Sequence, residues 1–264
     1  MLELKNISKT FNPGTVNEKR ALKNVSLTLE DGDFVTVIGG NGAGKSTMLN
    51  AIAGVWPVDQ GQILIDNQDV TKLPEYKRAA FLGRVFQDPM NGTAATMGIE
   101  ENLALALRRG QSRTLRVGIK NQEREVYKRL LATLGLGLEE RLTSKVGLLS
   151  GGQRQALTLL MATLKKPKLL LLDEHTAALD PKTAAKVLET TEMIVNRDKL
   201  TTLMITHNMK DAIVHGNRLI MMYDGKIVID VSGEEKKKLT VPQLLELFSK
   251  VSGSDEADDK LLLS

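Results

Sequence analysis

A glycine-rich run near the start of the sequence has the residue types and spacing of a phosphate-binding loop. Residues 39–46 are Gly-Gly-Asn-Gly-Ala-Gly-Lys-Ser and match the P-loop pattern G-x-x-x-x-G-K-[ST]. In such a loop, backbone N–H groups surround an anion at the start of a helix, and glycine lets the backbone approach it closely. We expect Lys45 to contact the β- and γ-phosphates of a nucleotide and the Ser46 hydroxyl to bind Mg²⁺. The predicted nucleotide-binding residues of this run are Gly39, Asn41, Gly42, Ala43, Gly44, Lys45, Ser46 and Thr47.

Two carboxylates in the second half of the sequence could complete a hydrolytic site. Asp173 and Glu174 follow an apolar run, residues 169–172, that is typical of a buried strand. At the end of such a strand Asp173 can hold Mg²⁺ through a water molecule, as the Walker B acid of P-loop NTPases does. Glu174 would then face the γ-phosphate, where a carboxylate can act as general base toward the attacking water. The alternative is an ordinary solvated loop, and the upstream P-loop favours the catalytic interpretation.

The neighbouring segments are those needed to position these motifs. Residues 33–38 form an apolar, β-branched run suited to a buried strand, and residues 45–53 have a helical pattern, so strand, loop and helix occur in the required order. Half-buried antiparallel strands are predicted at residues 2–11 and 21–29, and further strands at 62–66 and 81–86. After residue 164, strands and helices alternate, which predicts a largely parallel sheet, with segments at 168–172, 181–196, 201–206, 208–215 and 218–223. A hairpin with a D-G turn follows at Asp224 and Gly225, and residues 241–248 predict a closing helix.

Residues 98–164 have long amphipathic helical stretches and no convincing strand, which indicates a helical insertion. Within it, residues 107–131 contain eight basic and two acidic side chains. We interpret this excess as a solvated helix face, and a surface near anionic lipid headgroups or an acidic partner is the alternative. Nucleic acid is disfavoured, because Tyr127 is the one aromatic residue of this segment and single strands need several for stacking.

Composition excludes several classes of site. The 264-residue chain has a formal net charge of +4 and no cysteine, so it has no disulfide, thiolate metal site or cysteine nucleophile. No apolar run reaches the roughly 18 residues of a membrane helix, and the first residues lack a signal-peptide profile. We therefore expect a compact protein that would act at a membrane only through other chains.

Together these motifs resemble the ATP-binding cassette family over nearly the whole chain. The decisive match is Leu-Ser-Gly-Gly-Gln at residues 149–153, the signature sequence of that family. The resemblance implies that two cassettes pair head to tail and that the signature of one completes the ATP site of the other. Its position at the start of a helix predicted for residues 153–164 suits a phosphate. The signature residues predicted to bind nucleotide are Ser150, Gly151, Gly152 and Gln153.

Other family elements follow in order. The resemblance implies that Gln87 is the Q-loop glutamine, which contacts Mg²⁺ and the water, and that His207 is the switch histidine at the γ-phosphate. It also places Asp180 in the D-loop, which crosses the dimer interface. Phe11 resembles the aromatic residue that stacks on adenine, although a single aromatic could equally belong to the core.

One position departs from the family pattern. His175 stands where the family most often has a proline after the catalytic glutamate. Proline would restrict this loop, whereas histidine leaves it freer and adds a titratable group beside the γ-phosphate region. The favoured interpretation is a tolerated loop residue without a catalytic role.

The resemblance implies an α/β fold: a P-loop NTPase cassette with a parallel core sheet, an N-terminal antiparallel β subdomain and a helical insertion subdomain. We expect residues 1–264 to form one ATPase domain. Residues 1–87 and 165–235 would form the catalytic core with its β subdomain. Residues 88–164 would form the helical subdomain, and residues 236–264 a C-terminal helix and a tail with an acidic run at 254–259.

The resemblance further implies an ATP- and Mg²⁺-dependent ATPase subunit of a transporter on the cytoplasmic face of the membrane. Its implied partners are a second copy or a sister cassette, multi-spanning permease subunits and, through them, an extracytoplasmic solute-binding protein. The run at residues 173–181 also resembles a bacterial importer subgroup for tryptophan, tyrosine or similar small solutes. An exporter ATPase and a soluble cassette that remodels a protein assembly, such as an iron–sulfur scaffold ATPase, stay open. Nucleic-acid cassettes are disfavoured, because long coiled-coil insertions and zinc-binding cysteines are missing from the sequence.

Overall fold

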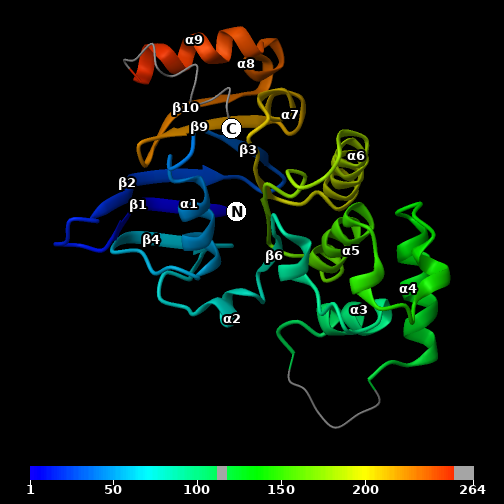
Figure 1. The fold of residues 1–264 in the computed structure, drawn as a ribbon. Coiled ribbons are helices and arrows are strands. Elements are labelled where there is room, and N and C mark those ends of the chain that lie inside the picture. The colour runs from blue at the N-terminus through cyan, green and yellow to red at the C-terminus, as the bar shows by residue number, and fades with distance from the viewer. Residues whose placement is uncertain (112–117, 253–264) are drawn as a thin grey trace.

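The computed structural model of the chain describes residues 1–111 and 118–252, in which two β-sheets lie beside a group of helices (Figure 1). The larger sheet has six strands in the order β10-β9-β3-β8-β7-β6. Five of them are parallel, namely β3 (Phe34–Ile38), β6 (Leu82–Val85), β7 (Leu169–Asp173), β8 (Thr202–Ile205) and β9 (Arg218–Tyr223). Strand β10 (Lys226–Ser232) pairs antiparallel with β9 through the predicted hairpin. The predicted α/β fold with a parallel core sheet is confirmed.

The second sheet is antiparallel, as the N-terminal alternation predicts. Its strand order is β2-β1-β4-β5, formed by β1 (Leu2–Phe11), β2 (Lys19–Leu29), β4 (Gln60–Ile65) and β5 (Gln68–Asp69). Helix α1 (Lys45–Ala53) shares one hydrophobic cluster with both sheets, and its Met48, Leu49 and Ile52 are fully buried. The helix after the glycine loop is therefore fixed between the two sheets.

The helical group lies to one side of the parallel sheet (Figure 1). It contains η1 (Pro89–Gly92), α3 (Ile99–Leu107), α4 (Asn121–Ala132), η2 (Leu138–Arg141), η3 (Val146–Leu148) and α5 (Gly151–Thr163). These helices bury a hydrophobic cluster of their own around Leu103, Tyr127 and Leu157. Helix α5 also packs Leu159 and Ala162 into the cluster that covers β7 and β8. The signature helix thus connects the helical group to the parallel sheet.

The remaining helices are α2 (Glu75–Arg78), α6 (Pro181–Asp198), α7 (Met209–Val214), α8 (Gly233–Lys238) and α9 (Val241–Ser252). The last of these packs Leu244 and Phe248 against β9 and β10. Within the described residues, every helix is too short or too polar to cross a membrane.

Most element boundaries agree with the prediction to within two residues, and the differences have local causes. Helix α5 begins at Gly151 rather than Gln153, because Ser150 caps it. Short elements such as β5 and α2 were not predicted, since two to four residues carry no periodicity. The acidic run at 254–259 lies outside the described residues, and the division into subdomains stays a prediction.

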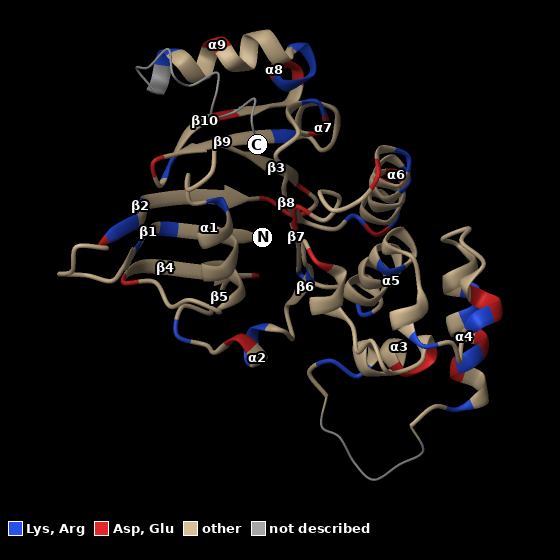
Figure 2. Cartoon of the chain, viewed as in Figure 1, with Lys and Arg blue, Asp and Glu red and all other residues tan. Residues whose placement is uncertain are grey.

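Part of the described basic segment is ion-paired, and basic (blue) and acidic (red) positions are interleaved along the ribbon of α4 (Figure 2). Arg124 Nε lies 2.7 Å from Glu100 Oε2, and Arg108 Nη2 lies 2.8 Å from Glu123 Oε1. Such pairs support the interpretation of a solvated, ion-paired face. Arg113 and Arg116 of this segment lie outside the described residues.

A buried arginine, Arg78, contacts the C-terminal end of α1, the helix that follows the glycine loop. Arg78 is 2% exposed, and its Nη1 donates to the carbonyl oxygens of Ala51 at 2.7 Å and Ile52 at 2.9 Å. Its other nitrogens donate to the carbonyls of Leu73 and Thr71. Helix C-terminal carbonyls lack partners within the helix and attract cations. Arg78 therefore adds a charged side-chain cap at this end, where the N–H of Gly54 also donates to the carbonyl oxygens of Ala51 and Asn50.

We expect Arg78→Met to lower the free energy of unfolding by about 2–4 kcal/mol, because several buried carbonyls lose a charged donor. Urea unfolding followed by circular dichroism measures the change. The control is Lys77→Met, which changes the neighbouring exposed side chain and should shift stability by less than about 0.5 kcal/mol. Equal unfolding midpoints for the two variants would show that α1 does not need this cap.

Candidate active site

The glycine loop lines a cavity of about 490 Å³ at the end of β3. Three predicted site residues from distant parts of the sequence line the same cavity: Phe11, Gln87 and Glu174. The other residues around it are Lys19, Ala21, Asn41, Gly42, Ala43, Gly44, Lys45, Ser46 and Thr47. The fold therefore brings together most of the predicted phosphate-binding and catalytic residues.

Close packing requires glycine at two positions of the loop. Gly39 has φ of +146°, and a Cβ there would lie 2.2 Å from the carbonyl oxygen of Met222. Gly44 has φ of +105°, and a Cβ there would lie 2.6 Å from the carbonyl oxygen of Ala21. Because α1 begins at Lys45, the loop holds its backbone N–H groups at a helix N-terminus, an arrangement that attracts phosphate.

The side chain of Lys45 folds back onto the loop. Its Nζ donates to the carbonyl oxygens of Gly39 at 2.6 Å and Gly40 at 3.3 Å, and the residue is 7% exposed. Burial lowers the pKa of Lys45, while the nearby carboxylates of Glu174 and Asp173 raise it. Phosphate oxygens could replace these carbonyls as acceptors and would compensate the buried charge more completely.

Asp173 ends β7 beside a cation that the sequence analysis missed. Its Oδ2 lies 3.6 Å from Arg84 Nη2, which also donates to Asn50 Oδ1 of α1 at 2.7 Å. The Arg84 guanidinium lies 4.5 Å from the centre of the Phe86 ring, next to Gln87. Burial raises the pKa of Asp173, opposed by the charge of Arg84. A basic residue inside an apolar strand is the sequence signal that could have identified Arg84.

The predicted base and switch histidine meet at the ends of adjacent strands. Glu174 Oε2 lies 4.0 Å from His207 Nδ1. The backbone of Glu174 is left-handed, with φ of +44°, and its N–H donates to the carbonyl oxygen of Ile205 at 3.1 Å. Because β7 and β8 are parallel neighbours, their carboxyl ends place these two side chains at one edge of the sheet.

The oxygen ligands predicted for Mg²⁺ fit that ion. The hydroxyl of Ser46, the amide of Gln87 and the carboxylate of Asp173 are hard oxygen donors, and Mg²⁺ commonly combines one carboxylate with substrate phosphates and water. Among the described residues, no group of three or more His, Cys, Asp or Glu could hold a metal ion. Mg²⁺ here would combine these side-chain oxygens with phosphate oxygens of the nucleotide.

The signature residues form a helix start away from this cavity. Ser150 Oγ accepts a hydrogen bond from Gln153 N at 3.3 Å, and Gln153 Oε1 accepts one from Ser150 N at 3.2 Å. Gly152 is buried, and a Cβ there would lie 2.1 Å from Thr183 Cγ2 of α6. Ser150, Gly151, Gly152 and Gln153 are not among the described residues that line the cavity of their own chain.

Asp180 caps α6 rather than facing the cavity. Its Oδ1 accepts a hydrogen bond from Thr183 N at 3.1 Å, and the hydrogen bonds with Thr183 lower the pKa of Asp180. Phe11 lies at the cavity edge, half-buried, with its ring edge-to-face on Trp56 at a centroid distance of 5.0 Å. Phe11 is thus open to a ligand and packed on one side.

The profile of the ABC transporter family matches residues 22–177. The chain belongs to this family. A tyrosine transport ATP-binding protein of Clostridioides difficile is 48% identical over 249 residues, covering 94% of this chain and 98% of that protein. The ABC transporter ATP-binding protein YxdL of Bacillus subtilis is 35% identical over 258 residues, covering 96% and 95%.

Solved structures agree with this assignment. A dimeric ATP-binding cassette in a post-hydrolysis state, bound to ADP and inorganic phosphate, aligns with a TM-score of 0.74 at 31% identity and covers 88% of this chain and 98% of that one. A second cassette, in its ADP conformation, aligns with a TM-score of 0.76 at 28% identity, covering 94% and 98%. The chain is therefore an ABC ATPase that binds and hydrolyses ATP.

Lys19 also lines the cavity of the cassette, and the sequence analysis did not identify it as a site residue. It lies on β2, and its Nζ is 3.1 Å from the position that a Cβ at Gly42 would take. This places a cation above the glycine loop. A basic residue in the strand that follows Phe11 is a weak signal, since many exposed strands carry lysine.

His175 does not lie beside the γ-phosphate region, so the expectation of a titratable group there is wrong. The residue is 2% exposed, and its Nε2 lies 3.1 Å from Thr191 Oγ1 of α6. Burial, together with the nearby His215, lowers the pKa of His175 to about 4. The ring is therefore neutral at pH 7, and the loop is anchored rather than freer.

We expect the burial of His175 to lower the free energy of unfolding of the cassette at acidic pH. A histidine with a folded-state pKa of about 4 binds its proton more readily when unfolded, so stability falls as the pH drops from about 6.5 to 4. Removing the imidazole in His175→Gln should reduce that fall by up to about 3 kcal/mol. Urea unfolding at a series of pH values measures it. Parallel pH curves for the variant and the wild type would contradict this assignment.

Proposed function

We propose that this cassette is the ATP-hydrolysing subunit of a bacterial importer for a small solute, with tyrosine or a related aromatic amino acid as the substrate class. The observation that carries this proposal is the 48% identity to a tyrosine transport ATP-binding protein along nearly the whole of both chains. A spermidine/putrescine import ATP-binding protein of Haemophilus influenzae is more distant, at 34% identity, and this chain covers only 59% of it.

In the proposed mechanism the glycine loop and Lys45 bind the phosphates of ATP. Phe11 would stack on adenine, and Lys19 would add a cation above the loop. Mg²⁺, held by Ser46, Gln87 and Asp173, would neutralise charge on the phosphate oxygens. The geometry in support is the shared cavity and the oxygen donors around it.

Hydrolysis is assigned to Glu174 with His207 beside it. Glu174 would accept a proton from a water molecule whose oxygen attacks the γ-phosphorus, and the bond to the β–γ bridging oxygen would break to give ADP and inorganic phosphate. His207, whose Nδ1 lies 4.0 Å from Glu174 Oε2, would orient the carboxylate relative to the γ-phosphate. The left-handed backbone at Glu174 supports a functional constraint at this residue.

We propose that a second cassette completes each ATP site. Ser150, Gly151, Gly152 and Gln153 would contact the γ-phosphate held by the partner, and Asp180 would lie at the dimer interface. Supporting this, the signature forms a helix N-terminus that does not line its own cavity, and the similar cassette bound to ADP and phosphate is dimeric. ATP could close such a dimer only by binding the closed state more tightly than the open one.

The partners in this proposal are permease subunits, which would span the membrane, and a solute-binding protein outside it. The cassette would sit on the cytoplasmic face. The support is the family itself and the transport proteins among the relatives.

We expect Glu174→Gln to bind ATP with a dissociation constant within a few-fold of wild type, to form a dimer with ATP and to hydrolyse it about 10²–10³ times more slowly. Steady-state phosphate release and light scattering after size exclusion measure the two properties. Glu235→Gln, at an exposed position on α8, serves as the control. Turnover at the wild-type rate in Glu174→Gln would refute the assignment of the base.

The substrate class is tested in proteoliposomes that contain the cassette, its permease and the binding protein. Tyrosine or tryptophan should raise ATP hydrolysis several-fold above the level without solute, because the loaded binding protein favours the closed dimer. Spermidine is the comparison solute. Stimulation by spermidine without any response to aromatic amino acids would overturn the proposed substrate.

A further inference from the structure

His175, which departs from the family pattern, connects the loop of Glu174 to α6. His175 directly follows Glu174, and its buried ring contacts Thr191 Oγ1 at 3.1 Å. Proline at this position would push the preceding residue toward extended backbone, whereas Glu174 has φ of +44°. Histidine therefore permits the left-handed conformation, and its contact with Thr191 restrains the loop in place of a proline ring.

The next residue of α6 contacts the far end of the short helix that follows the switch histidine. Glu192 Oε1 lies 2.9 Å from His215 Nδ1, and His215 follows the last residue of α7. Helix α7 has only six residues, and His207 stands just before its cap, Asn208. Lys236 Nζ donates to the carbonyl oxygens of His215 and Gly216, which holds the same end of α7 on its other side.

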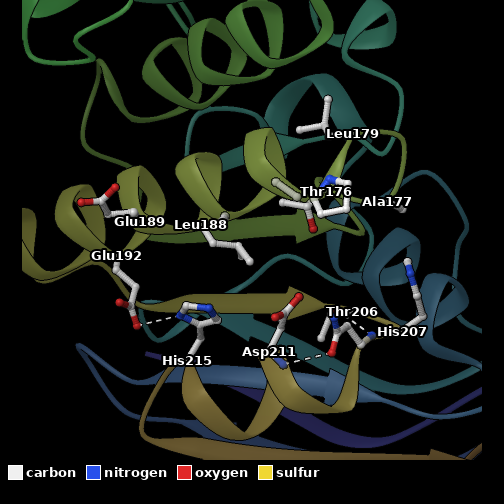
Figure 3. Close-up of a pocket in the computed structure, with 14 residues that line it drawn as sticks. Thr176, Ala177, Leu179, Leu188, Glu189, Glu192, Thr206, His207, Asp211 and His215 are labelled. Atoms are coloured by element: carbon white, nitrogen blue, oxygen red, sulfur yellow. Dashed lines mark hydrogen bonds and ion pairs between the residues drawn. The ribbon is translucent and has the colours of Figure 1, made fainter.

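A cavity of about 530 Å³ lies between α6 and α7, so apolar packing does not fill the space between these helices. Figure 3 shows the Glu192–His215 contact at one end of this cavity and His207 at the other. The polar contact therefore spans the gap that apolar side chains leave open. The contact adds a polar link between α7 and α6, while Met209 and Ala212 pack the other side of α7 against the parallel sheet.

We propose that Thr191 and Glu192 are positioning residues that together set the separation of Glu174 and His207. Thr191 acts through His175 on the loop of Glu174, and Glu192 acts through His215 and α7 on His207. This inference rests on the proposed function, in which Glu174 is the base. The same helix begins against Gly152 of the signature, through Thr183. Helix α6 therefore connects the signature to both catalytic side chains.

The test compares two adjacent threonines. Thr190 and Thr191 are both buried, and each hydroxyl donates to the carbonyl oxygen four residues earlier at 2.8 Å. Thr190→Val and Thr191→Val therefore lose the same helix contact, but only Thr191→Val loses the contact to His175. We expect Thr191→Val to lower kcat for ATP hydrolysis about three- to tenfold with KM for ATP within about twofold. Thr190→Val should have the wild-type kcat. Thr191→Ser should also have it, because serine keeps the hydroxyl that contacts His175.

A second pair tests the other half of the proposal without touching the core. Glu192→Ala removes the partner of His215, while Glu189→Ala changes a side chain that lines the same cavity but pairs with Lys186 on its own helix. We expect Glu192→Ala to lower kcat and Glu189→Ala to have the wild-type kcat. The double variant of Thr191→Val and Glu192→Ala should lose less than the product of the two single losses, since both act on one separation.

The outcomes separate this inference from the proposed function. Equal kcat values for Thr191→Val and Thr190→Val, or for Glu192→Ala and Glu189→Ala, would overturn the inference, provided that Glu174→Gln is inactive. An active Glu174→Gln would instead overturn the proposed base. If Thr191→Val does not fold, the Glu192 pair decides, because Glu192 is 39% exposed and its loss leaves the core intact.

Discussion

The close fit of the glycine loop between two sheets is the constraint on which the site depends. Gly39 packs against the carbonyl of Met222 in β9, and Gly44 against the carbonyl of Ala21 in β2. A Cβ at either position would lie within 2.6 Å of a backbone oxygen, so a substitution would force the sheets apart. This contact sets the position of α1, and with it Lys45, relative to both sheets. The remaining site residues are then placed by strand ends that face the same edge.

The parts of this site that follow from local patterns could be predicted from the sequence. Lys45 and Ser46 sit in a motif whose conformation is set by its own glycines, and the strand before it has a continuous apolar run. The position of Glu174 follows from the apolar strand that precedes it. Fold class followed because alternating strands and helices leave few ways to build a sheet.

Features that depend on tertiary contacts could not be predicted. Arg84 reaches Asp173 only because β6 and β7 are neighbours, and no spacing in the sequence records that pairing. The sequence indicated that His175 adds a titratable group beside the γ-phosphate region, but α6 covers the ring and supplies a hydroxyl partner. In both cases the partner lies in another element.

Helix α6 shows how contacts within one chain could serve the proposed site shared by two chains. Thr183 in the first turn of α6 lies so close to Gly152 that a side chain at residue 152 would displace the helix. Further along α6, Thr191 contacts His175 and Glu192 contacts His215. Helix α6 has proline only at its first position and no glycine, so it lacks the residues at which helices usually kink. In the proposed dimer, we expect a displacement of the signature by a phosphate of the other cassette to reach Glu174 and His207 together. We expect that transmission to depend on the alignment of His175 Nε2 with Thr191 Oγ1, since a hydrogen bond weakens steeply when its geometry changes.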